Sequence, residues 1–184
     1  MQQSSIEWLG RGVWFLIFSI AVITPRVYAA PIIPPPPSIA ASSYLLIDAK
    51  SKKVLVEKNS AQRLPPASLT KIMTAYIVEE EIISGRLKMD EAAPISVKAW
   101  RTGGSKMFIR EGTEVAVTDL LKGVIIQSGN DASVALAEHI AGSEDAFADM
   151  MNQQAVALGL TNTNFLNATG LPDEEHYSTA EDLA

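Results

Sequence analysis

Four consecutive prolines, Pro34 to Pro37, set the first limit on how this chain folds. Proline has no backbone N–H and a fixed φ, so such a run fits neither a helix interior nor a central strand. It favours polyproline II, an extended and semi-rigid conformation. We therefore interpret residues 30–41 as a proline-rich linker and expect the folded domain to occupy residues 42–184.

The segment before this linker is typical of a secretory signal peptide. The apolar run from Val13 to Thr24 is shorter than the roughly 20 residues that a membrane-spanning helix needs. Small residues follow it, and cleavage after Ala29 would place Val27 and Ala29 at the two selective positions. A buried core helix is the alternative interpretation. Our hypothesis is that residues 1–29 direct export to the periplasm or cell envelope.

Composition excludes several classes of function. The chain is 47% hydrophobic and 20% charged, with a net charge of −6, which argues against a disordered tail and against a nucleic-acid partner. There are no cysteines, and the two histidines, His139 and His176, do not have the spacing of metal ligands. We expect no metal and no other cofactor. We expect His139 to be structural and His176 to lie in a polar loop without a partner.

From Ser42 onward the pattern predicts strands first and helices afterwards. Tyr44–Ile47 and Val54–Val56 predict an antiparallel hairpin with a charged turn. Apolar spacing predicts helices over 67–84, over two parts of 115–141 divided by Gly123 and by Ser128-Gly129, and from Ser143 to Leu158. We expect no second group of strands. This order favours an α+β or α/β chain.

A serine and a lysine three residues apart, Ser68 and Lys71, are the first candidate for chemistry. This spacing places both side chains on one face of a helix. The helix N-terminus favours negative charge, and a buried, neutral lysine can accept the serine proton. With 16 serines and 9 lysines, about 0.8 such pairs are expected by chance. A capping serine beside an exposed lysine is therefore the alternative for this pair alone.

A second candidate group, Ser128-Gly129-Asn130, lies sixty residues after Ser68. It interrupts two helical patterns, and Gly129 permits an unusual backbone there. Such a break presents side chains toward a cleft. Ser128 could relay a proton, and the Asn130 amide could bind both a substrate carbonyl and the base.

Together these groups resemble the serine penicillin-recognising enzymes, and within them the low-molecular-weight penicillin-binding proteins that are D-alanyl-D-alanine carboxypeptidases. Five blocks carry the resemblance and span most of residues 42–184: Pro66–Thr74, Gly104–Phe108, Gln127–Ala132, Ala141–Phe147 and Leu158–Phe165.

The resemblance implies a β-lactamase/DD-peptidase transpeptidase-like fold. It implies that Ser68 is the acylated nucleophile, Lys71 the general base, Ser128 a further catalytic residue and Asn130 a substrate-binding residue. The implied substrates are peptidoglycan stem peptides ending in D-Ala-D-Ala, and β-lactam antibiotics would be covalent inhibitors. The family acts in the cell envelope without a cofactor, in peptidoglycan synthesis and the control of cell shape.

Some features of that family do not occur in this sequence. The Lys-Thr-Gly motif on the strand that walls the cleft, the later β-rich domain and the C-terminal membrane anchor are absent. Ser178 and Glu181 form a capping box, which predicts a helix, yet only three residues follow. We interpret residues 42–184 as the hairpin and helical subdomain of a truncated catalytic domain without the remaining sheet strands. We expect little carboxypeptidase activity from it alone.

Two other functions stay open on the sequence. One is a β-lactamase-like hydrolase, although Ser-Gly-Asn replaces the Ser-Asp-Asn of class A β-lactamases. The other is a catalytically inactive fragment that binds the envelope.

Overall fold

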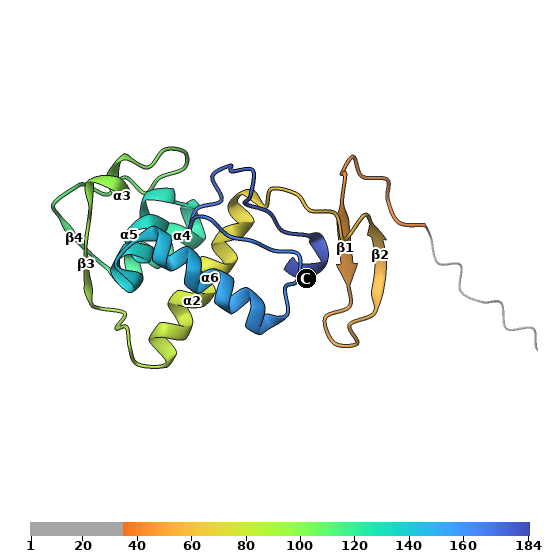
Figure 1. Cartoon of the computed structure of the whole chain (residues 1–184), viewed down its shortest axis with the longest axis horizontal. Helices are drawn as coiled ribbons and strands as arrows, with labels where there is room; N and C mark the ends of the chain where they lie inside the picture. Colours follow the sequence, from red (N-terminus) through yellow and green to blue (C-terminus); the bar gives the residue numbers. More distant parts are fainter. Residues whose placement is uncertain (1–34) are drawn as a thin grey trace, which may run out of the picture. The chain divides into compact units, whose positions relative to one another are not determined.

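The predicted N-terminal hairpin is present in the computed structural model, which describes residues 35–184 (Figure 1). Strand β1 (Tyr44–Ile47) pairs antiparallel with β2 (Val54–Lys58). In the turn, the Asp48 carboxylate accepts hydrogen bonds from the backbone N–H and the hydroxyl of Ser51, both at 2.7 Å. Aspartate commonly stabilises turns in this way, so the hairpin has a local reason for its shape.

The compact unit of the structure extends from Ile39 to Ala184. The predicted signal peptide lies outside the described residues. The described part of the predicted linker, residues 35–41, contains no helix or strand. No helix within residues 35–184 combines the length and the apolar character needed to cross a membrane.

The four helices expected from the sequence are present and form what we call the helical body: α2 (Thr70–Ile83), α4 (Val117–Gln127), α5 (Asn130–Ala141) and α6 (Glu144–Leu158). The expected break at Gly123 is wrong, because this residue lies inside α4. A side chain there would collide with Met107 and crowd Ala132. Glycine at this position therefore reflects a close approach of neighbouring elements.

A second pair of strands corrects the expectation that the chain has only one. Strand β3 (Ala92–Pro94) pairs antiparallel with β4 (Glu114–Ala116), and the short helix α3 (Val97–Arg101) lies between them in the sequence. Strands of three residues are too short to show an alternating pattern, which explains why no local pattern predicted them.

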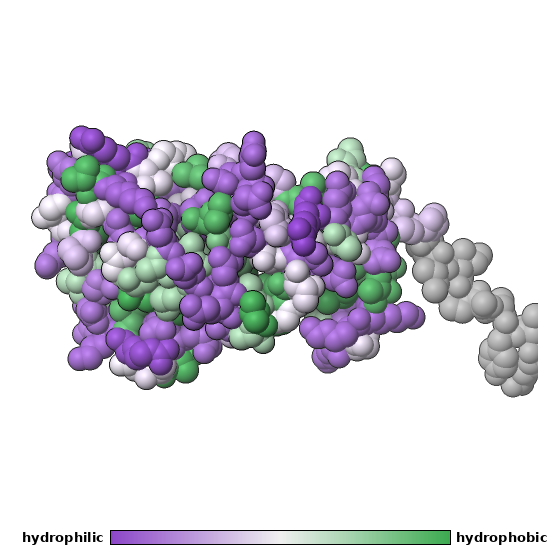
Figure 2. Space-filling model, in the orientation of Figure 1, coloured by the Kyte–Doolittle hydropathy of each residue, from purple (hydrophilic) through white to green (hydrophobic). Residues whose placement is uncertain are grey.

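Helix α5 is the centre of the helical body. Its residues from Asn130 to Ala137 are all buried. One apolar cluster joins α5 to α3, α4 and β3, and a second joins it to α2 and α6 around Phe147 and Phe165. Small side chains on α5, such as Ala132 and Ala135, let the surrounding elements approach closely. Apolar side chains also reach the surface, as Figure 2 shows for one face.

A long loop, residues 159–179, leads from α6 back toward the hairpin and the start of α2. Isolated bridges pair Leu64 with Ser178 and Asn164 with Tyr177. The loop ends at α7 (Ala180–Leu183). Because of this loop, residues about a hundred positions apart in the sequence meet beside α2.

The predicted capping box is displaced by one residue. The N-cap of α7 is Thr179, whose hydroxyl accepts a hydrogen bond from the N–H of Asp182 at 3.0 Å. Ser178 cannot take this position because its backbone bonds to Leu64 in both directions. Its hydroxyl contacts Thr163 instead, at 2.8 Å.

Candidate active site

Ser68 lies in a 3₁₀ turn, η1 (Ala67–Leu69), directly before α2. The sequence predicted Ser68 in the first turn of the helix, so its observed position differs from the predicted one by less than one turn. Ala67 has a positive φ of 48°, and the side chain of Ser68 is exposed. The nucleophile candidate is therefore presented at the N-terminal end of a partly buried helix, where backbone N–H groups and the helix dipole favour an oxyanion.

Lys71 is buried one turn further along and makes three polar contacts. Its Nζ lies 3.5 Å from Ser68 Oγ, 2.7 Å from Asn130 Oδ1 and 2.6 Å from the backbone carbonyl oxygen of Thr169. Burial lowers the pKa of Lys71, because desolvation penalises the ammonium form. Burial thus shifts Lys71 toward the neutral amine that a general base needs.

The number of acceptors around Lys71 matters for that role. A neutral amine has two N–H donors and one lone pair. Asn130 and Thr169 each offer one acceptor at short distance, so together they can take both donors. The lone pair is then left for the hydroxyl proton of Ser68, which is the remaining polar neighbour.

Ser128 and Asn130 occupy the break between α4 and α5 that the sequence predicted. Ser128 ends α4 in the left-handed conformation, with φ 53°. The Asn130 amide nitrogen donates to the Gly103 carbonyl at 2.7 Å, which directs Oδ1 toward Lys71. The expected contact between Asn130 and the base is therefore present.

A pocket of about 450 Å³ lies beside these residues. Ser68, Lys71 and Ser128 all line it, and Ile72, Tyr76 and Ile125 contribute apolar surface. Within residues 35–184, no three histidine or acidic side chains gather in a way that could hold a metal ion. The arrangement is suited to nucleophilic attack by a serine on a carbonyl carbon.

Asp131 is a buried residue beside the site that the sequence analysis missed. Its carboxylate accepts hydrogen bonds from the backbone N–H groups of Met107, Phe108 and Ile109, at 2.9–3.3 Å. It thereby fixes the loop that also contains Gly103, the partner of Asn130. The signal available in sequence was only an acid in the first turn of an apolar helix, which equally describes a surface residue near a helix N-terminus.

His176 corrects another expectation, because it is buried and has partners. Its Nδ1 accepts the backbone N–H of Leu166 at 3.0 Å, so the neutral ring carries its proton on Nε2 and donates to Thr70 Oγ1 at 2.8 Å. Its ring meets Phe165 edge-on. Burial lowers the pKa of His176, although the nearby Asp173 acts in the opposite direction. This histidine ties the 159–179 loop to the first residue of α2.

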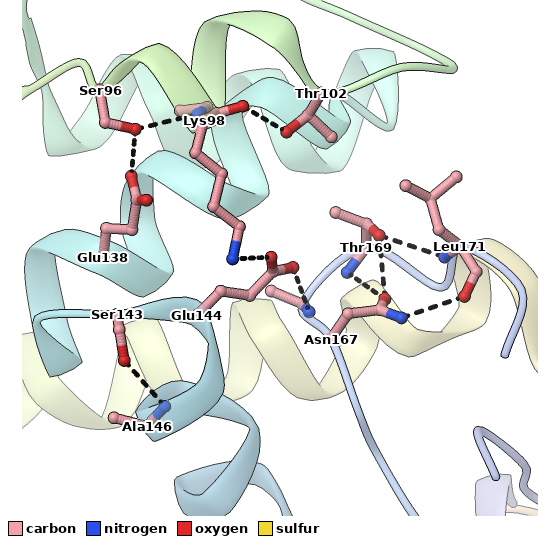
Figure 3. Close-up of polar contacts among 12 residues, drawn as sticks. Ser96, Lys98, Thr102, Glu138, Ser143, Glu144, Ala146, Asn167, Thr169 and Leu171 are labelled. Carbon is pink, nitrogen blue, oxygen red and sulfur yellow. Dashed lines mark hydrogen bonds and ion pairs between the residues drawn. The ribbon is translucent and has the colours of Figure 1, made fainter.

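Thr169 is the other contributor to the site that sequence reasoning missed, since it acts through its backbone. The loop crosses η1 at Gly170, where a Cβ would overlap the Ala67 carbonyl and where φ is +82°. Both facts require glycine at that position. The Asn167 side chain folds back to accept the N–H groups of Thr169 and Gly170, as Figure 3 shows in part.

The sequence profile of one known family, described as D-alanyl-D-alanine carboxypeptidase, matches residues 30–184. The chain belongs to this family. Among its relatives, the D-alanyl-D-alanine carboxypeptidase DacF of Bacillus subtilis is 50% identical over 142 residues, which make up 77% of this chain and 36% of DacF.

Solved structures of a carboxypeptidase and of a penicillin-binding protein confirm the expected fold class. The carboxypeptidase DacD of Francisella tularensis superimposes with a TM-score of 0.81 at 47% identity, over 85% of this chain and 38% of that one. Penicillin-binding protein D2 of Listeria monocytogenes, in an ampicillin-bound form, gives a TM-score of 0.72 at 29% identity, over 81% of this chain and 60% of that one. The chain thus spans well under half the length of DacF and DacD.

Proposed function

We propose that this protein is a serine-type D-alanyl-D-alanine carboxypeptidase that acts through an acyl-enzyme on Ser68. The observation that carries the proposal is the environment of Lys71, whose buried Nζ has two short acceptors and lies 3.5 Å from Ser68 Oγ. Membership of the carboxypeptidase family supports the substrate class, peptidoglycan stem peptides ending in D-Ala-D-Ala.

In the proposed reaction, Ser68 Oγ attacks the carbonyl carbon of the penultimate D-alanine while Lys71 Nζ accepts its proton. The amide bond then breaks, and the terminal D-alanine leaves with a proton returned from Lys71 or relayed by Ser128. Water attacks the ester on Ser68, which releases the shortened peptide and restores the serine. Asn130 holds Lys71 and contributes to substrate binding.

β-Lactams would react at the same serine, because their strained amide opens to an ester whose leaving group stays attached. The ampicillin-bound relative from Listeria supports this class of inhibitor. We further propose that residues 1–29 direct export, that the protein acts in the periplasm or envelope, and that it serves peptidoglycan synthesis and cell shape. Full-length members of the family would associate with the membrane through a C-terminal anchor.

A β-lactamase-like activity has less support in the pocket. Fast deacylation needs a group that activates water beside the ester. The acidic residue that lines the pocket is Glu79, which lies eleven residues beyond Ser68, or about 16 Å along a helix at 1.5 Å per residue. That backbone separation exceeds the reach of a glutamate side chain, so its carboxylate cannot touch the ester.

The direct test is D-alanine release from diacetyl-L-Lys-D-Ala-D-Ala by the complete gene product. We expect release that Ser68→Ala abolishes, with the circular dichroism spectrum unchanged because Ser68 is exposed. Release that survives this substitution would contradict the proposal. Rapid turnover of penicillin without D-alanine release would identify a β-lactamase, and neither activity would identify an inactive binding fragment.

A further inference from the structure

The loop that carries the Thr169 carbonyl has no regular secondary structure of its own, yet that carbonyl lies 2.6 Å from Lys71 Nζ. The preceding residue, Ala168, is held at both of its backbone groups. Its carbonyl accepts the Thr74 hydroxyl at 2.8 Å, and its N–H donates to Glu144 Oε1 at 3.1 Å. Two side chains from different helices therefore fix the peptide units next to the base.

Glu144 is the less expected of these two anchors, because it is a mostly buried acid, 8% exposed, that the mechanism does not use. It is the first residue of α6, where the helix dipole stabilises a carboxylate. Figure 3 shows its two oxygens facing different elements. Oε1 accepts a hydrogen bond from the N–H of Ala168, and Oε2 forms an ion pair with Lys98 Nζ of α3 at 2.9 Å.

We propose that Glu144 is a positioning residue for Lys71, acting through Ala168 and the Thr169 carbonyl. This inference rests on the proposed function, since it assumes that Lys71 is the base. If the carbonyl shifts, one N–H of the neutral amine loses its acceptor and the lone pair no longer points at Ser68. Misplacing a reacting group by about 1 Å can cost a hundredfold in rate.

Glu144 has two bonds, and only one of them reaches the site. The ion pair with Lys98 is open to water on the lysine side, since that side chain is 53% exposed, and such pairs contribute little. The Ala168 N–H is buried, so removing its acceptor leaves a donor without a partner. Variants can separate these two bonds.

Three variants of the complete gene product test the proposal. Glu144→Ala removes both bonds. Glu144→Gln keeps an oxygen for the Ala168 N–H, and Lys98→Ala breaks only the ion pair. We expect the penicillin acylation rate constant to fall about tenfold or more in Glu144→Ala with non-covalent binding unchanged. We expect it to stay within about threefold of wild type in the other two. Melting temperatures show whether each variant is folded at the assay temperature.

A second readout does not depend on activity. The Lys71 pKa, followed by NMR of its side chain, should move in Glu144→Ala and stay at the wild-type value in Lys98→Ala. Equal acylation by folded Glu144→Ala and wild type, or equal loss in Glu144→Ala and Glu144→Gln, would overturn the positioning role. Wild-type protein that penicillin does not acylate would instead overturn the proposed function, and the Lys71 titration would still show whether Glu144 positions Lys71.

Discussion

No residue of the four-residue β1 or the five-residue β2 is buried, whereas six of the 14 residues of α2 and eight of the 12 residues of α5 are. The hairpin is shaped by backbone pairing and by the Asp48 turn. The helical body is shaped by packing between elements that are distant in sequence. Burial lowers the pKa of Lys71, which favours its use as a base, so the chemistry lies in the helical body.

The largest expected difference between the two regions concerns lysines. Lys71→Met keeps an unbranched side chain, one atom shorter, but removes the base, so we expect acylation by a fluorescent penicillin to slow by about a thousandfold or more. Lys53→Met, at an exposed position of the hairpin turn, is the matched control and should label at the wild-type rate. Similar rates for the two variants would show that another group accepts the proton.

A second contrast concerns stability. Phe147 is fully buried in the cluster between α5 and α6, so Phe147→Ala should lower the free energy of unfolding by about 3–5 kcal/mol. Leu55 in β2 is 58% exposed, so Leu55→Ala should change it by less than about 0.5 kcal/mol. Urea unfolding followed by circular dichroism measures both. Comparable losses of unfolding free energy in the two variants would mean that the hairpin packs against another surface in solution.

The helical body should also respond to pH through His176. Its folded-state pKa is lowered below the ordinary 6.5, so the unfolded state binds more protons as the pH falls below 6.5. The contribution of His176 to the free energy of unfolding is therefore fully present above about pH 6.5. On acidification this contribution declines, by at most about 1.4 kcal/mol per pH unit, until the pH has passed the folded-state pKa.

Thermal melts between pH 7.5 and 5 measure this decline. His176→Gln keeps a donor for Thr70 and an acceptor for the Leu166 N–H but does not titrate, so its melting temperature should depend less on pH. An identical pH dependence in the two proteins would assign the decline to other groups.

The smallest expected effect is local to the hairpin. Asp48→Ala removes the acceptor for the Ser51 N–H and should speed hydrogen exchange in the turn. Asp48→Asn keeps an acceptor and should protect the turn nearly as well. Neither substitution should change exchange in α5. A global increase in exchange would show that the hairpin and the helical body unfold together.

Much of this fold could be predicted from local patterns. Two short β-rich runs on either side of a charged turn identified β1 and β2, and apolar spacing with caps at Ser143 and Gly159 identified α6 closely. The three-residue strands β3 and β4 could not be predicted, because their pairing depends on contacts and not on a repeating pattern.

The candidate site also contains residues that the sequence could predict and residues that it could not. Ser68, Lys71, Ser128 and Asn130 stand in recognisable motifs, and the structure brings them together. Thr169 contributes a backbone carbonyl, which no side-chain motif reveals. Glu144 and His176 act on a loop that returns to α2 only in the folded chain, so their partners could not be read from the sequence.

The most direct test of the central claim is to identify the residue that penicillin acylates. The complete gene product is incubated with benzylpenicillin, digested and mapped by mass spectrometry, beside Lys71→Met. The account predicts one penicilloyl adduct on Ser68, strongly reduced in the variant. An adduct on Ser128 or elsewhere, equal labelling of both proteins, or no adduct on the wild type would contradict it.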